Sequence, residues 1–359
     1  MSDEAYHRPP IRVALMGLGR AMFDEHVPVY LKHPALFEVV CACDTLKERR
    51  DRLAAHFPNC KMYRQLPDML GERNIDLVDI ATPTVNHVAE TVMSLETGRW
   101  TLLEAPMATT PDDNQILRGA AAKAKNRLVV FQRGMFDADY LLAKQAMADR
   151  RLGEINYIQI RSGDYVRRDD WQAIKRLGGG ACYYGMTDLV MQALKLLPMP
   201  PYQIWSELKR LVSVGDAEDY VKLGIKTRGM VSADVEYSCS VLPGDREAKF
   251  KIKGSLGCMT VMAGAKEGVL RAVDPKFNFP RRRSSVRTPP LGDLHEEIPV
   301  IEEPYRLPPG TLSGPSAFWR HLYDSVRTAV PFPVTLEESM EAIKLLYLMK
   351  KNSPYWSGK

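Results

Sequence analysis

Short, continuously apolar runs alternate with helical patterns through the first 130 residues of this 359-residue chain. Strands that are apolar along their whole length are buried on both faces, as in parallel sheets that helices cover on either side. The pattern therefore predicts an α/β domain with a doubly wound parallel sheet over residues 1–132. In chain order, the expected strands are 11–17, 37–44, 75–83, 100–106 and 127–133, and the expected helices are 22–33, 45–57, 85–98 and 111–124.

From residue 133 the pattern changes to alternation with a period of two, which is typical of antiparallel sheets with one covered face and one face that is open or covered by a partner. These strand-like runs are 155–166, 202–214, 220–227, 232–242, 247–254 and 257–263, with helices expected at about 136–150 and at 181–198. The proline-rich stretch 275–316 is expected to be irregular. The sequence predicts a C-terminal α+β domain over 133–335 with a large, mostly antiparallel open sheet. A final helix in 336–359 should pack back on the first domain.

Composition narrows the class of protein. Hydrophobic residues make up 45% of the chain, and 49 basic against 44 acidic residues leave a net charge of only +5, which is too small and too dispersed to indicate nucleic-acid binding. The dense basic run 280–287 is interpreted as a solvated loop or, less simply, as a clamp for an anion. The polar N-terminus is unlike a signal peptide, and no apolar run reaches membrane-spanning length. Without a C-x-x-C pair, the six cysteines predict reduced thiols, no metal site and a cytoplasmic location.

The segment "MGLGRAM", residues 16–22, follows the first strand and opens a helix, which is the position of a dinucleotide fingerprint. Gly17 allows a tight turn, and Gly19 lets the backbone approach a pyrophosphate at the helix N-terminus. Asp44 ends the second strand, where its carboxylate can accept from both ribose hydroxyls and repel a 2′-phosphate. We expect NAD rather than NADP. Arg49 and Arg50 lie nearby in the sequence and favour the opposite choice, because an arginine can bind the 2′-phosphate of NADP. The predicted cofactor-binding residues of this Rossmann domain are Gly17, Leu18, Gly19, Arg20, Ala21 and Asp44.

Three segments, 75–108, 133–158 and 167–194, resemble the glucose–fructose oxidoreductase/inositol dehydrogenase (Gfo/Idh/MocA) family, and the likeness extends over nearly the whole chain. The first ends in "EAPMA", where the family has Glu-Lys-Pro. The resemblance implies that the residues around the nicotinamide half of the cofactor are Thr82, Pro83, His87, Glu104, Ala105 and Pro106. It also implies a cis peptide between Ala105 and Pro106. The alternative for His87 is a residue at a helix start that is satisfied by the backbone.

Both proton-handling residues of the family are replaced. Ala105 stands where the family has the lysine that binds the substrate oxygen. Tyr184 and Asp188 stand where its catalytic helix carries Asp and, four residues on, His; the chain has no histidine between His87 and His295. Tyr184 and Asp188 are spaced i, i+4 and should share one helical face, so they are the candidate acid/base residues, with a raised pKa for a carboxylate that lacks the lysine's charge. The alternative is that both are kept for packing and solubility.

The expected function is that of an NAD-dependent oxidoreductase acting on a small polar molecule, which the resemblance makes a sugar, a polyol or a related intermediate. Trp171, Lys175 and Tyr183 are candidate substrate contacts, although Trp171 and Lys175 are equally well explained as loop anchors. Without the lysine, reduction of an imine or conjugated double bond, or a redox-assisted elimination or hydrolysis with recycled NAD, is easier to support. The rival hypothesis is a dinucleotide-holding sensor or scaffold. A homodimer or homotetramer through the open sheet face is expected.

Overall fold

The computed structural model describes residues 8–198, 203–245, 247–280 and 296–357. Six parallel strands form the N-terminal sheet in the order β3-β2-β1-β4-β5-β6. Their bounds are β1 Ile11–Met16, β2 Phe37–Cys43, β3 Lys61–Tyr63, β4 Leu77–Ile80, β5 Trp100–Glu104 and β6 Leu128–Phe131. This is the doubly wound order, so the predicted α/β fold is confirmed. The short edge strand β3 was not predicted.

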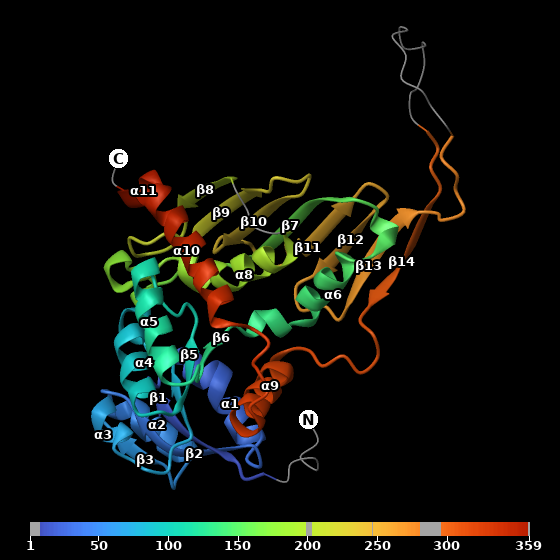
Figure 1. The fold of residues 1–359 in the computed structure, drawn as a ribbon. Helices are drawn as coiled ribbons and strands as arrows, with labels where there is room; N and C mark the ends of the chain where they lie inside the picture. The colour runs from blue at the N-terminus through green and yellow to red at the C-terminus, as the bar shows by residue number, and fades with distance from the viewer. Residues whose placement is uncertain (1–7, 199–202, 246, 281–295, 358–359) are drawn as a thin grey trace.

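Helices connect these strands on both faces of the sheet (Figure 1). They are the π-helix η2 Met22–His26, α1 Val27–Lys32, α2 Lys47–His56, α3 Leu66–Leu70, the 3-10 turn η3 Thr84–Asn86, α4 His87–Glu96 and α5 Pro111–Lys123. The start of α5 follows from its sequence. Thr110 accepts a hydrogen bond from the Asp113 backbone N–H through its side chain, and Pro111 occupies the first turn, where its missing N–H costs nothing.

The second sheet has eight strands in the order β14-β13-β12-β11-β7-β10-β9-β8, antiparallel except for the central pair β7 and β10. The strands are β7 Ile155–Gly163, β8 Gln203–Lys209, β9 Tyr220–Lys226, β10 Ser232–Ser238, β11 Ala248–Gly254, β12 Gly257–Met262, β13 Glu267–Val273 and β14 Val300–Arg306. Along β7, Ile158 and Ile160 are fully buried while their neighbours are partly exposed. The predicted open sheet, mostly antiparallel and covered on one face, is therefore confirmed.

The helices α6 Ala138–Ala146 and α8 Met186–Leu196 lie along the covered face of this sheet (Figure 1). The one-turn helix α7 Ala181–Tyr184 precedes α8. Helix α10, Leu336–Asn352, begins with a capping box between Thr335 and Glu338 and contacts elements of both domains, namely α5, β6, α8 and β8. The short helix α11, Pro354–Ser357, follows it.

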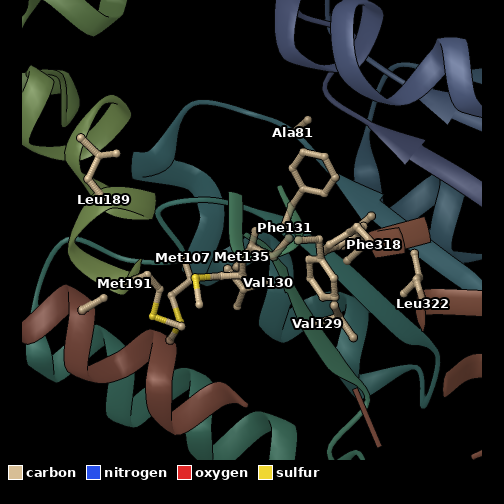
Figure 2. Packing of buried hydrophobic residues seen from close by; sticks show 14 of the residues in the cluster. Ala81, Met107, Val129, Val130, Phe131, Met135, Leu189, Met191, Phe318 and Leu322 are labelled. Atoms are coloured by element: carbon tan, nitrogen blue, oxygen red, sulfur yellow. The ribbon is translucent and has the colours of Figure 1, made fainter. Parts of the chain in front are cut away.

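Two elements lie where the sequence indicated irregular structure or no element. Strand β14 forms inside the stretch 275–316 at the edge of the large sheet, where Pro304 pairs with Val269. Proline has no backbone N–H to donate, and it is tolerated here because β14 is an edge strand. Helix α9, Pro315–Thr328, packs on the N-terminal domain next to β1. Its Phe318 ring lies 4.8 Å from that of Phe131 on β6, and Figure 2 shows this contact beside Met107 and Met135. Residues 281–287 of the basic run lie outside the described residues.

Candidate active site

The glycine loop follows β1 at the carboxyl edge of the N-terminal sheet. Gly17 has φ +84°, and a Cβ atom there would lie 2.6 Å from Cγ2 of Thr82 and 2.8 Å from its backbone nitrogen, so only glycine fits. A Cβ on Gly19 would meet nothing within 4 Å, because that side of the loop is open. The backbone next to Gly19 is therefore accessible to a ligand phosphate, as the fingerprint requires.

Asp44 fastens the glycine loop to the end of β2. Its Oδ2 accepts from the Leu18 backbone N–H at 2.8 Å, and its Oδ1 accepts from Leu46 N–H at 2.9 Å. The guanidinium of Arg49 lies 3.5 Å from Oδ2, and Arg50 donates to the Asp44 backbone carbonyl at 2.5 Å. Oδ2 thus has two donors, Leu18 and Arg49, whereas Oδ1 keeps a second lone pair, so Asp44 retains acceptor capacity for a ribose hydroxyl.

These residues border a cleft of about 480 Å³. From the predicted cofactor set it is lined by Gly17, Gly19, Arg20, Ala21, Asp44, Thr82 and Pro83, and it also includes Arg49, Asn86, Glu90, Trp171 and Gln172. The set fits a dinucleotide, since it combines open glycine backbone, a carboxylate for ribose and a positive side chain. Nicotinamide dinucleotides supply hydride transfer when bound; the chain's own residues bind and orient them.

His87 lies behind the cleft, not in its lining. It is 1% exposed, and its two ring nitrogens lie 2.9 Å from the Pro106 carbonyl oxygen and 2.8 Å from that of Thr82. Burial lowers the pKa of His87, so the neutral ring donates to one of the two carbonyls. His87 thus joins the Thr82 loop to the Ala105–Pro106 peptide, which is cis. This placement matches the alternative of a histidine held by backbone groups.

Glu90 was not among the predicted residues. It lines the cleft from α4 and accepts a hydrogen bond from the Thr82 hydroxyl. Burial raises the pKa of Glu90 to about 7, although the Thr82 hydrogen bond opposes the shift. Its protonation therefore changes the charge of the cofactor cleft near neutral pH.

His26, the last residue of η2, is a second site residue that was not predicted. The ring is fully buried, with Nδ1 2.8 Å from Asp79 Oδ2 and Nε2 2.9 Å from Glu104 Oε1. Tyr30 also donates to Asp79 Oδ2, at 2.5 Å. Burial opposes the charge on His26, but the Coulombic attraction of Asp79 and hydrogen bonds to Asp79 and Glu104 outweigh it and raise the pKa to about 10. His26 is therefore an imidazolium held between the carboxyl groups of Asp79 and Glu104.

Glu104 and Ala105 lie where two further cavities meet. One, of about 180 Å³, shares Ala21, Trp171 and Gln172 with the cofactor cleft. The other, of about 320 Å³ and here called the inner pocket, shares four residues with that small cavity: Glu104, Ala105, Tyr183 and Tyr184. The three cavities form an adjacent series from the glycine loop to the covered face of the large sheet.

Asp188 and Tyr184 both line the inner pocket, but a turn at Gly185 separates their helices and each has its own partner. Asp188 Oδ2 accepts from the Gly134 backbone N–H at 3.1 Å, while its buried Oδ1 has no hydrogen-bond partner. Burial raises the pKa of Asp188 to about 6. The Tyr184 hydroxyl lies 3.2 Å from Cys239 Sγ, and burial raises its pKa well above the ordinary value, so it does not ionise near neutral pH.

The candidate substrate residues separate in the structure. Trp171 lines the cofactor cleft and the small cavity, and Tyr183 lines the small cavity and the inner pocket. Lys175 instead donates to the Tyr355 backbone carbonyl at 2.8 Å, and its Nζ lies 3.8 Å from the centre of the Tyr355 ring. Lys175 therefore anchors its loop to α11.

Two cations that the sequence did not point to line the inner pocket, and both are ion-paired. Lys249, on β11, donates to both carboxylate oxygens of Asp139, at 3.0 and 3.1 Å. Arg133 binds Asp137 at 3.1 Å and lies 3.4 Å from Glu25. Only the folded arrangement brings these residues to the pocket, because they come from segments more than a hundred positions apart.

A doubly wound domain with an open glycine loop, joined to a sheet domain that completes a second pocket, defines a two-domain dinucleotide-binding oxidoreductase. Comparison with known proteins agrees. The model of the oxidoreductase family with an NAD-binding Rossmann fold matches residues 11–132, and the model of the GFO/IDH/MocA C-terminal domain matches residues 140–260. The chain belongs to the GFO/IDH/MocA family of oxidoreductases, so the resemblance seen in its sequence is confirmed.

Individual relatives are distant. An uncharacterised oxidoreductase of Schizosaccharomyces pombe is 29% identical over 258 residues, which is 69% of each chain. The scyllo-inositol 2-dehydrogenase (NADP(+)) of Bacillus subtilis is 22% identical over 353 residues, covering 96% of this chain and 94% of that protein. An NAD-binding protein from Listeria innocua has a similar fold, with a TM-score of 0.77 at 22% identity over 94% of this chain and 92% of that one. In the part of the chain that the structure describes, no helix is long and apolar enough to cross a membrane.

Proposed function

We propose that this protein is an NAD-dependent oxidoreductase of a small polar substrate, with Asp188 as the acid/base residue in place of the family's histidine. The observation that carries the proposal is the buried Oδ1 of Asp188, an acceptor without a partner on a residue that lines the inner pocket, which the small cavity joins to the cofactor cleft. With a pKa of about 6, the carboxylate is mostly ionised at neutral pH yet basic enough to exchange a proton. Gly134 N–H fixes its orientation.

The other residues have supporting parts in this proposal. Ala21 and Trp171 lie between the cofactor cleft and the cavity where the substrate would meet the nicotinamide. His26 holds the carboxyl group of Glu104 in place at the same junction. Tyr184, whose phenol stays protonated, shapes the pocket and can donate a hydrogen bond if its contact with Cys239 is exchanged.

The preference for NAD over NADP rests on Asp44, whose negative charge at the cleft opposes a 2′-phosphate. Calorimetric titration with NADH and NADPH tests it, with tighter binding of NADH expected. A panel of sugars, polyols and imines, followed by absorbance near 340 nm, tests catalysis. Asp188→Asn should lose about 10²–10⁴-fold in rate without loss of NADH affinity. Tight NADH binding with no turnover of any compound would favour the sensor or scaffold role.

We also propose a cytoplasmic protein that forms a dimer or tetramer through the uncovered face of the large sheet. That face exposes Trp205, Met262 and Val269, at 53%, 38% and 44%, among charged side chains. Large apolar groups on an otherwise polar sheet face are typical of interfaces between subunits. Light scattering at micromolar concentration should give at least a dimer, and Trp205→Glu should shift it toward monomer.

A further inference from the structure

The inner pocket is strongly acidic. Its lining carries four carboxylates and two cations: Glu25, Glu104, Asp137 and Asp188 against Arg133 and Lys249. Two further buried groups, His26 and Asp139, pair directly with these side chains, and a third, Asp79, pairs with His26. When all are ionised, six carboxylates oppose three cations, which leaves three negative charges uncompensated.

None of the three cations is available to a substrate anion. Lys249 is 9% exposed and bound through both oxygens of Asp139, and Arg133 is shared by two acidic residues, as described above. His26 lies between Asp79 and Glu104. An alkoxide developing in the inner pocket would therefore meet excess negative charge, and neither cation among the described lining residues is free to pair with it.

Two buried acceptors in the lining have no partner. Asp188 Oδ1 is one, and Oε1 of Gln192, a residue that is 0% exposed, is the other. Both side chains are oriented by the same residue, since Gly134 donates its N–H to Asp188 and accepts from Gln192 Nε2 at 2.8 Å. Buried acceptors without donors are costly, and a ligand that brings N–H groups would satisfy them.

From this charge and these free acceptors, and resting on the oxidoreductase function proposed above, we propose that the inner pocket binds its substrate as a cation and that the reaction is the reduction of an iminium to an amine. The N–H of the iminium donates to Asp188 Oδ1 or Gln192 Oε1, and its positive charge offsets the excess of carboxylates. A polyol offers hydroxyl donors but no charge.

The reaction balances without the family's lysine. A hydride from reduced NAD forms the new C–H bond, and the π pair of the C=N bond becomes the lone pair on nitrogen. The substrate loses its positive charge, the oxidised nicotinamide gains one, and the amine then takes a proton that the carboxyl group of Asp188 relays from solvent. Because no alkoxide forms, Ala105 in place of a lysine costs the reaction nothing.

Matched ring compounds test the recognition step apart from catalysis. Piperidine, protonated at neutral pH, and tetrahydropyran have the same ring but differ in charge. Calorimetry on the intact protein with NAD present should show piperidine binding at least about tenfold more tightly, since a hydrogen bond to a charged group is worth that much. Asp188→Asn should remove most of this difference. Asp51→Asn, which removes an exposed carboxylate on α2, should leave it unchanged.

Catalysis is tested with 1-piperideine and NADH, and with scyllo-inositol and NAD, at 340 nm. Turnover of 1-piperideine together with the piperidine preference supports the inference. Equal binding of the two rings by the unaltered protein overturns it whether or not the variants fold. The inference is also overturned if the protein turns over scyllo-inositol but not 1-piperideine, although the oxidoreductase function would then stand. Failure of the protein to bind either nicotinamide dinucleotide would refute the oxidoreductase function itself, while the ring comparison still reports on the pocket.

Discussion

The Nε2 atom of His26 lies 2.9 Å from Oε1 of Glu104, so an imidazolium buried beneath the N-terminal sheet contacts the residue where the cofactor side and the inner pocket meet. Its other nitrogen binds Asp79, and the ring packs 4.3 Å from that of Phe131. Glu104 Oε2 accepts from the Ala105 backbone N–H at 3.0 Å. Both carboxylate oxygens of Glu104 are thereby fixed in position, one of them by a residue 78 positions earlier in the chain.

Replacing His26 by Gln should destabilise the protein, because Asp79 would remain buried without its cationic partner. Breaking such a buried pair typically costs about 3–5 kcal/mol, which urea unfolding would measure. Asp76, a partly exposed carboxylate bound by two arginines, gives a matched comparison: Asp76→Asn should cost less. A loss for His26→Gln no larger than that for Asp76→Asn would show that burial does not make the His26–Asp79 pair the more important one for stability.

The protonation of His26 should also make the free energy of unfolding depend on pH. Its pKa is raised to about 10 in the folded state, above the ordinary value of 6.5, so its contribution is complete below about pH 6.5 and is lost as the pH rises through about 10. Urea unfolding at a series of pH values from 6 to 10 should show this decline in the unaltered protein. The profile of His26→Gln should lack it.

Much of the fold was predictable because buried positions are occupied by apolar residues that recur with the period of the helix or strand. The N-terminal strands are mostly apolar, with isolated charged residues such as Glu38 and Asp79, and the C-terminal strands alternate. Strand β14, "VIEEPYR", carries a proline and two acidic residues because an edge strand is half solvated, so it gives only a weak signal. Helix α9 was missed although one face carries Phe318, Trp319, Leu322 and Tyr323, because it begins at the end of the proline-rich stretch 275–316, which indicated irregular structure, and no element was assigned to the residues after it.

The site was less predictable than the fold. Asp44 and Asp188 occupy recognisable positions after a strand and in a helix. His26 and Lys249 carry no local signal, because their role depends on carboxylates from other elements, Asp79 and Asp139. Lys175 is the opposite case, a residue whose position suggested a substrate contact but which binds elsewhere. A lysine before a glycine loop can bind a substrate or a distant backbone carbonyl, and in the structure it binds a carbonyl. Pairings of this kind are set by tertiary packing and cannot be derived from periodicity.

Affinity for NADH should fall as the pH rises through about 7. Burial raises the pKa of Glu90 to about 7, so below that pH the cleft wall is neutral and above it carries a negative charge toward an anionic dinucleotide. Titrations between pH 6 and 8.5 should show the loss, and Glu90→Gln should abolish it. A pH-independent affinity in the unaltered protein would mean that Glu90 does not sense the cofactor.

Turnover should fall as the pH drops below about 6. Asp188 must be ionised to bind a cation or accept a proton, and burial raises its pKa to about 6, with Asp137 adding to the shift while Arg133, Gly134 N–H and Lys249 oppose it. The acid limb of kcat/KM reports this ionisation in the free enzyme. Asp188→Asn should remove the limb as well as the rate. A limb that persists in the variant would belong to another group.

Installing the family's lysine at Ala105 should weaken the protein's own reaction, not strengthen it. Ala105 lines the inner pocket with Asp188, so an ammonium there would pair with the carboxylate, lower the pKa of Asp188 and offset the pocket's negative charge. In Ala105→Lys we expect piperidine affinity to fall about tenfold, the acid limb to move below pH 6 and NADH affinity to stay the same. Ala105→Met, which adds a long neutral side chain, separates charge from bulk and should keep the acid limb in place. If both variants lose piperidine affinity alike with the acid limb unmoved, the size of the side chain and not its charge controls binding in the pocket.

The double variant Ala105→Lys with Asp188→His, which restores both family residues, should lose imine reduction altogether. If it oxidises scyllo-inositol instead, these two positions select between reactions at C–N bonds and reactions at C–O bonds.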